Sequence, residues 1–173
     1  MFFDNLPQDY EVYIFYYPGA VPNEDLESQL RNLGSITGRN LFVNIGKLND
    51  PNYSKLVSKF EIRKFPVIII TAIDRLASPP TAFFTTYVKI DSQRILNSPA
   101  LAIECLQKLF NLFIEGKISE AVSQFRKDQR NALIGNLIDV ITNALKGIRD
   151  FIVERDISVS LVEGRFELKY RGG

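Results

Sequence analysis

Residues 60–70 have the sequence FEIRKFPVIII, and this stretch decides the fold. From residue 67 to residue 73 the chain is almost entirely apolar and rich in β-branched side chains, with Pro66 directly before it. A short apolar run without alternation is typical of a strand in the middle of a covered sheet. Proline is tolerated where a strand begins, since no ladder hydrogen bond is lost there. We therefore predict a central strand over residues 67–73.

Two strand–helix units are predicted before this strand. Residues 11–17 are β-branched and aromatic and indicate a buried strand, which Pro18-Gly19 ends. A helix follows from residues 22–25, with acidic residues in its first turn and Gly34 at its end. Residues 41–45 indicate a second strand, and Asp50-Pro51 is a typical helix start. Strands joined by a helix are expected to be parallel and right-handed.

A further strand and helix are predicted after it. Residues 83–90 indicate a strand close enough to residues 67–73 for an antiparallel pair. Ser98-Pro99 then begins a helix that ends at Gly116. Cys105 lies at the spacing of that helix's core leucines and is predicted to be a small buried hydrophobe. Residues 11–116 thus have the order βαβα followed by ββα.

The C-terminal part has a different pattern, so we divide the chain into a domain at 1–116 and a helical extension at 117–173 that ends in a β-hairpin. Residues 118–156 have a helical pattern, with a possible break at 128–130. Their apolar seam consists of Ile134, Ile138, Ile141, Leu145, Ile148 and Ile152. The seam predicts either a homodimer through residues 134–152 or a helix folded back on the chain's own sheet. Residues 157–170 alternate around Glu163-Gly164 and predict the terminal hairpin.

The composition excludes several classes of function. The chain has 173 residues, no histidine, one cysteine, and 21 basic against 20 acidic residues. Without histidine there is no Ser-His-Asp or Cys-His catalysis and no usual zinc site. The balanced charge argues against nucleic acid and anionic membranes as partners. We expect a cytoplasmic protein without cofactor or metal, since no signal peptide or membrane-spanning run is found.

The segment 60–70 resembles the thioredoxin-family segment in which an aromatic, a β-branched and a basic residue precede a cis-proline and a buried strand. Asn49-Asp50-Pro51 after residues 41–45 also looks like the family's second strand–helix junction. The resemblance implies a mixed four-stranded sheet with flanking helices and a cis bond before Pro66. The family's Cys-x-x-Cys belongs in residues 16–22, which read YYPGAVP and contain no cysteine. Redox chemistry is therefore not expected.

The resemblance also implies a binding surface. Redox-active relatives hold substrate peptides between the active-site loop and the cis-proline loop. We therefore predict that the chain binds a protein or peptide partner, and we favour this function over an enzymatic one. The predicted binding residues are Tyr17, Pro18, Gly19, Ala20, Val21, Phe65 and Pro66.

Two other functions stay open. The chain loosely resembles glutathione transferases, because Ile90-Asp91-Ser92 is similar to their glutathione-carboxylate contact and Tyr16 or Tyr17 could supply the hydroxyl. Gly172-Gly173 resembles the diglycine end of ubiquitin-like modifiers, which would make the chain a protein modifier.

Overall fold

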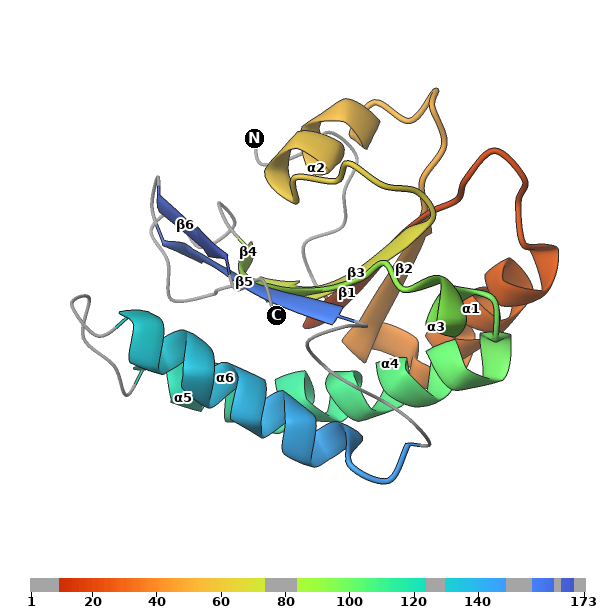
Figure 1. Cartoon of the computed structure of the whole chain (residues 1–173). Coiled ribbons are helices and arrows are strands. Elements are labelled where there is room, and N and C mark those ends of the chain that lie inside the picture. The colour runs from red at the N-terminus through yellow and green to blue at the C-terminus, as the bar shows by residue number, and fades with distance from the viewer. Residues whose placement is uncertain (1–9, 74–83, 124–129, 149–156, 164–165, 170–173) are drawn as a thin grey trace.

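The protein is an α/β structure built on one open, mixed sheet (Figure 1). The computed structural model describes residues 10–73, 84–123, 130–148, 157–163 and 166–169. The strands are β1 (Val12–Tyr17), β2 (Leu41–Ile45), β3 (Val67–Ile73), β4 (Phe84–Ile90), β5 (Ile157–Glu163) and β6 (Phe166–Lys169). The helices are α1 (Glu24–Thr37), α2 (Tyr53–Lys59), α3 (Gln93–Leu96), α4 (Pro99–Ile114), α5 (Lys117–Ser123) and α6 (Arg130–Leu145), with a 3-10 turn at Gly38–Asn40.

The strand order is β2-β1-β3-β4-β5-β6. β1 and β2 pair in parallel, with Val12 opposite Leu41, and β3 pairs antiparallel with both β1 and β4. The predictions of parallel first strands, a central strand over 67–73 and an antiparallel partner after it are confirmed. Because β1 and β2 point the same way and β3 points back, the end of β1 and the start of β3 lie at the same edge of the sheet.

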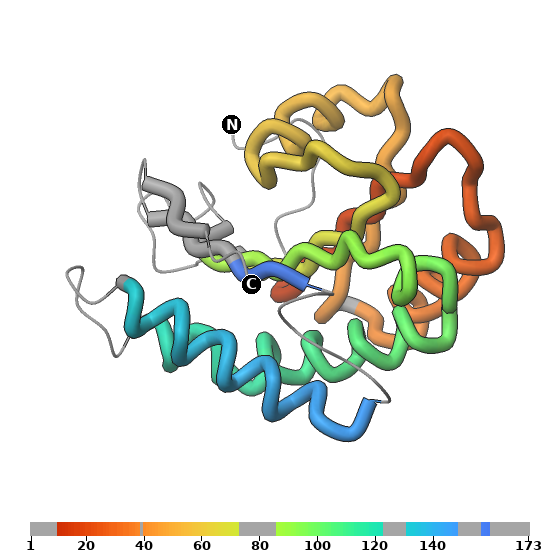
Figure 2. Tube along the Cα trace, viewed as in Figure 1, coloured from red at the N-terminus to blue at the C-terminus, as the bar shows by residue number. Residues whose placement is uncertain are grey.

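Helices cover both faces of the sheet (Figure 2). β1 alternates between the two resulting cores, since successive side chains of a strand point to opposite faces. Val12, Ile14 and Tyr16 belong to the larger core, with α1, α4, α5 and α6, whereas Tyr13, Phe15 and Tyr17 belong to the smaller core, with α2. All six side chains are buried, which is why residues 11–17 show no hydrophobic–polar alternation.

The first helix is longer than predicted. α1 continues past Gly34 to Thr37, and Gly38, with a φ of 68°, follows its last residue. The prediction that Gly34 ends the helix is therefore wrong. A Cβ at Gly34 would lie 3.0 Å from Cγ2 of Val43 in β2, so this glycine lets α1 approach the sheet closely. Its role is in packing, and the left-handed conformation that favours glycine at a helix end occurs at residue 38.

The C-terminal helices pack against the rest of the chain. Ile134, Ile138, Ile141 and Leu145 in α6 are all buried in the larger core, beside α4. The described part of the predicted seam is therefore covered within the chain, as the second of the two sequence interpretations had it. The predicted dimer through residues 134–152 would need an exposed isoleucine seam, and the described residues do not provide one. In the part of the chain described, no helix is both long and apolar enough to cross a bilayer.

The chain returns to the sheet after α6. β5 pairs antiparallel with β4, with Val88 opposite Val159, and β6 pairs antiparallel with β5. The prediction of a four-stranded sheet is therefore wrong, because β5 and β6 extend the same sheet to six strands, and residues from both sides of Gly116 share one sheet and one core. Residues 164–165 and 170–173 lie outside the described residues. The second residue of the predicted turn at Glu163-Gly164 and the whole diglycine at 172–173 are among them.

Candidate functional site

The loop after β1 lies directly against the start of β3. The Phe65–Pro66 peptide bond is cis. A Cβ at Gly19 would lie 3.4 Å from Cδ of Pro66 and 3.6 Å from its backbone nitrogen. Gly19 and Pro66 are 47 positions apart in the sequence, and their segments therefore touch at the same edge of the sheet.

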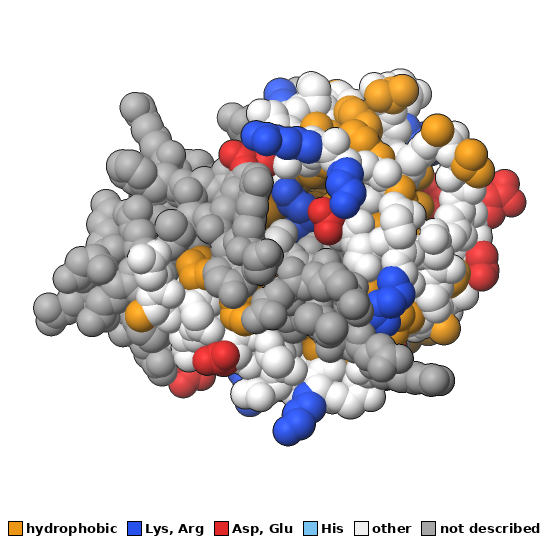
Figure 3. Space-filling view, viewed as in Figure 1, with side chains coloured by type: hydrophobic (Ala, Val, Ile, Leu, Met, Phe, Trp, Pro, Cys, Tyr) orange, Lys and Arg blue, Asp and Glu red, His pale blue; other side chains and the backbone are white. Residues whose placement is uncertain are grey.

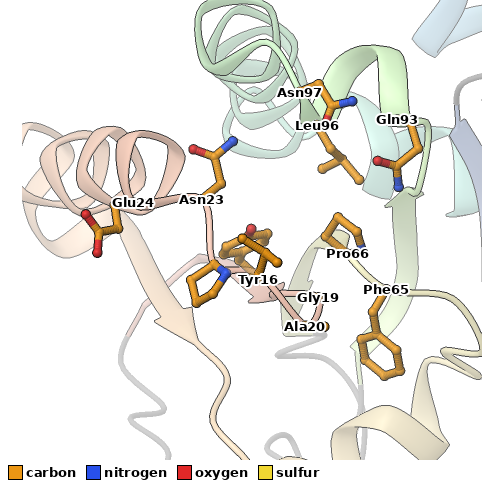
Figure 4. Close-up of a pocket in the computed structure, with 12 residues that line it drawn as sticks. Tyr16, Gly19, Ala20, Asn23, Glu24, Phe65, Pro66, Gln93, Leu96 and Asn97 are labelled. Carbon is orange, nitrogen blue, oxygen red and sulfur yellow. The ribbon is translucent and has the colours of Figure 1, made fainter.

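A pocket of about 690 Å³ opens beside this contact (Figure 4). We call it the cis-proline pocket. Three segments form it: the end of β1 with the loop into α1, the turn before β3, and α3 with the residue after it. Its lining residues are Tyr16, Gly19, Ala20, Val21, Pro22, Asn23, Glu24, Phe65, Pro66, Gln93, Leu96 and Asn97.

The pocket contains five of the seven binding residues predicted from the sequence, namely Gly19, Ala20, Val21, Phe65 and Pro66. The other two, Tyr17 and Pro18, are not among the lining residues. Tyr17 points to the opposite face of the sheet, into the core beneath α2, and its ring lies 5.4 Å from that of Tyr53.

Sequence reasoning named Tyr16 only as a hydroxyl for a transferase-like activity and missed the other lining residues. Gln93, Leu96 and Asn97 come from the short helix after β4, and Asn23 and Glu24 from the start of α1. A signal for the first group was present. β4 is antiparallel to β3, so the residues that follow Ile90 must return to the edge where β3 begins.

Tyr16 lies at the α1 side of the pocket and is almost completely buried. Burial raises the pKa of its phenol, the negative charge of Glu27 raises it further, and a hydrogen bond from the backbone amide of Asn23 acts in the opposite direction. The phenol is therefore protonated at neutral pH, so that it can donate a hydrogen bond but is not a base.

The Tyr17 hydroxyl is buried without a hydrogen-bond partner among the described residues. Burial raises the pKa of this phenol strongly, and the neighbouring Asp50 adds to the rise. A hydroxyl placed in this way contributes nothing to the pocket and carries an uncompensated desolvation cost.

The two adjacent tyrosines should respond in opposite ways to removal of their hydroxyls. Tyr16→Phe removes the phenol oxygen that the Asn23 amide stabilises, and we expect a loss of up to about 1 kcal/mol in the free energy of unfolding. Tyr17→Phe removes an unpartnered buried hydroxyl, and we expect no loss, or a gain of up to about 1 kcal/mol. Urea denaturation of both variants measures the difference, and equal losses would contradict this assignment.

The backbone of the segments beside the pocket lies outside the regular helices and strands. Within the described part of the chain, no backbone hydrogen bond involves Gly19, Ala20, Val21 or Phe65. Two of these residues also carry exposed apolar side chains, Val21 with 85% of its surface exposed and Phe65 with 40%. Free amides and carbonyls beside apolar side chains are the features by which a protein pairs with an extended peptide.

The pocket contains no thiol. Cys105 lies in the larger core with 0% of its surface exposed. Across the described ranges, no group of three histidine, cysteine, aspartate or glutamate side chains is placed to hold a metal ion. The side chains at the pocket can therefore supply hydrogen bonds and apolar contacts, and the Glu24 carboxylate lies at its outer margin on α1 (Figure 4).

Comparisons with known proteins found no relative for this chain. No protein-family model matches it, and neither the curated proteins nor the solved structures contain a match.

Proposed function

We propose that this chain is a redox-inactive, thioredoxin-like protein that binds an extended segment of a protein or peptide in the cis-proline pocket. The observation that carries the proposal is the contact between Gly19 and Pro66, which brings a loop without cysteine against the turn before β3. The strand order β2-β1-β3-β4 supports the thioredoxin-like assignment, because it unites the predicted βαβα and ββα halves in one mixed sheet.

The surface chemistry supports binding by a peptide main chain. Val21 and Phe65 offer apolar area, and the backbone groups next to them are unengaged within the described residues. Burying an aromatic side chain contributes roughly 2 kcal/mol, and each backbone hydrogen bond about 1 kcal/mol. Three or four such contacts amount to about 6 kcal/mol, and subtracting the cost of ordering the peptide leaves weak binding, with a dissociation constant between roughly 0.1 and 1 mM.

Selection from a phage-displayed library of random linear peptides tests this function. We expect the wild-type chain to enrich peptides that compete with one another for one site. The double variant Val21→Asp, Phe65→Asp should bind the enriched peptides at least about tenfold more weakly, because it removes the apolar contacts and introduces charge.

The matched control is Ile36→Asp. Ile36 is another exposed aliphatic side chain, with 76% of its surface exposed, but it lies in the last turn of α1 and does not line the pocket. We expect Ile36→Asp to bind like the wild type. A library that enriches nothing, or peptides that bind the double variant as well as the control, would overturn the proposal.

The proposed redox inertness has its own test. Because Cys105 is completely buried in the larger core, its thiol should not react with Ellman's reagent in the native protein and should react fully in guanidinium chloride. The rate at which the absorbance of the released thionitrobenzoate rises, without and with guanidinium chloride, measures the accessibility of the thiol. Fast reaction of the native protein would show an accessible thiolate and argue against an inert scaffold.

A further inference from the structure

Side-chain amides surround the cis-proline pocket. Asn23 approaches from α1, and Gln93 and Asn97 from α3 and the residue after it, around the apolar surfaces of Leu96 and Pro66 (Figure 4). Each amide side chain can both donate and accept hydrogen bonds, as a peptide main chain does. The side-chain oxygen Oδ1 of Asn23 already accepts a hydrogen bond of 3.0 Å from the backbone amide of Leu26. The side-chain NH2 group of Asn23 is therefore the part that can bind a ligand.

The α1 side of the pocket is acidic. Glu24 is the one charged side chain among the described lining residues, and Asp25 and Glu27 stand beside it in the first turn of α1. The three carboxylates compensate the positive end of the helix dipole, so this helix start does not favour an anion. A compact anionic ligand would meet a carboxylate and no cationic lining residue.

The opposite end, beside Phe65, is basic. Arg63 and Lys64 directly precede Phe65, and both are exposed. In the space-filling view, Lys and Arg side chains gather over α2 and the segment leading into β3, with a few Asp or Glu side chains among them, and further Asp and Glu side chains lie at the margin formed by α1 (Figure 3). The pocket thus lies between an acidic and a basic surface.

We propose that the occupant of the pocket is an extended peptide segment with one apolar anchor, a basic residue on the side of α1 and an acidic residue on the side of Arg63 and Lys64. This inference rests on the proposed function and adds the class of peptide. The apolar anchor of the peptide fills the centre of the pocket, and the side-chain amides of the pocket bind the peptide main chain. The charges at the two ends of the pocket fix the direction in which the peptide binds. Opposite charges at these ends attract, and reversed charges repel.

A charge scan of one selected peptide tests the proposal. All charged residues flanking the anchor are first replaced by serine, and a single lysine or glutamate is then placed at each flanking position in turn. Fluorescence anisotropy measures the dissociation constants. We expect lysine to increase affinity on one side of the anchor and glutamate on the other, each by about twofold to fivefold, as for exposed ion pairs.

Two variants assign the ends of the peptide. Glu24→Gln should abolish the gain from lysine and keep the gain from glutamate, and Lys64→Gln should do the reverse. Glu104→Gln, an exposed residue of α4 that does not line the pocket, is the matched control and should change neither gain. Raising the salt concentration should reduce both gains, since the pairs are exposed to solvent.

The outcomes separate this inference from the proposed function. If the serine peptide binds through Val21 and Phe65 but lysine and glutamate help on the same side or not at all, the charge assignment is overturned and the peptide pocket stands. A library selection that enriches no peptide overturns both.

Discussion

Replacing Gly46 with alanine should lower the free energy of unfolding by about 3 kcal/mol, the upper part of the usual range for overpacking. Gly46 follows β2, and its amide donates a hydrogen bond of 2.7 Å to the carbonyl oxygen of Tyr16. A Cβ at this position would lie 2.5 Å and 2.6 Å from Cδ1 and Cε1 of Tyr17. The Tyr17 ring is buried and packs edge-on against Tyr53, so it has little room to move away.

Thermal denaturation measures the effect, with an expected fall in Tm of roughly 6 to 12 °C. Gly135→Ala is the matched control. Gly135 lies in α6, and a Cβ there would meet no described atom beyond its own helix backbone and chain neighbours within 4 Å, so alanine should stabilise the protein by about 1 kcal/mol through its higher helix propensity. Adding Tyr17→Leu to Gly46→Ala should recover part of the loss. A Gly46→Ala protein as stable as the wild type would show that the Tyr17 ring is not held there.

Replacing Ile141 with alanine should cost about 4 kcal/mol. Ile141 lies in the middle of α6, has 0% of its surface exposed and belongs to the larger core. Truncating it removes three carbon atoms and leaves a cavity among residues that α4 and the sheet hold in place. Thr142→Ala, at the next and exposed position, is the control and should change stability by less than about 0.5 kcal/mol.

Chemical denaturation at several protein concentrations measures both variants. We expect midpoints that do not change with concentration, because α6 is covered by its own chain. A small loss in Ile141→Ala, together with a wild-type midpoint that rises with concentration, would instead indicate that a second copy covers the isoleucine seam.

Local sequence signals predicted the elements between residues 11 and 116 well. Three elements could be recognised from their own residues alone, namely those at 67–73, 41–45 and 99–114. The signals used were β-branched runs, a Ser-Pro helix start and apolar stripes, and each of these acts over only a few residues. The end of α1 was misjudged, since Gly34 and Gly38 are both plausible endings. What distinguishes them is the tertiary structure, in which Gly34 packs closely against Val43 of β2 and the positive φ occurs at Gly38.

The pocket was predicted less completely than the fold, for a geometrical reason. Adjacent residues of a strand face opposite sides, so Tyr16 and Tyr17 cannot both line one pocket. The resemblance located the loop and Pro66 but did not decide which tyrosine faces them. The contributions of Gln93 and Asn97 depend on where β4 ends in space, which follows from the sheet order and not from spacing in the sequence.

The pairing of β5 with β4 has a consequence for how the protein is made. β4 gains its second neighbour only when residues 157–163 are available, long after β4 itself has left the ribosome. During synthesis its outer edge, with Tyr87 and Val88 among its residues, stays open to pairing with other nascent chains. Production of the chain truncated after Gly116 should therefore give aggregates, and supplying residues 117–173 as a separate chain during expression should increase the yield of dispersed protein.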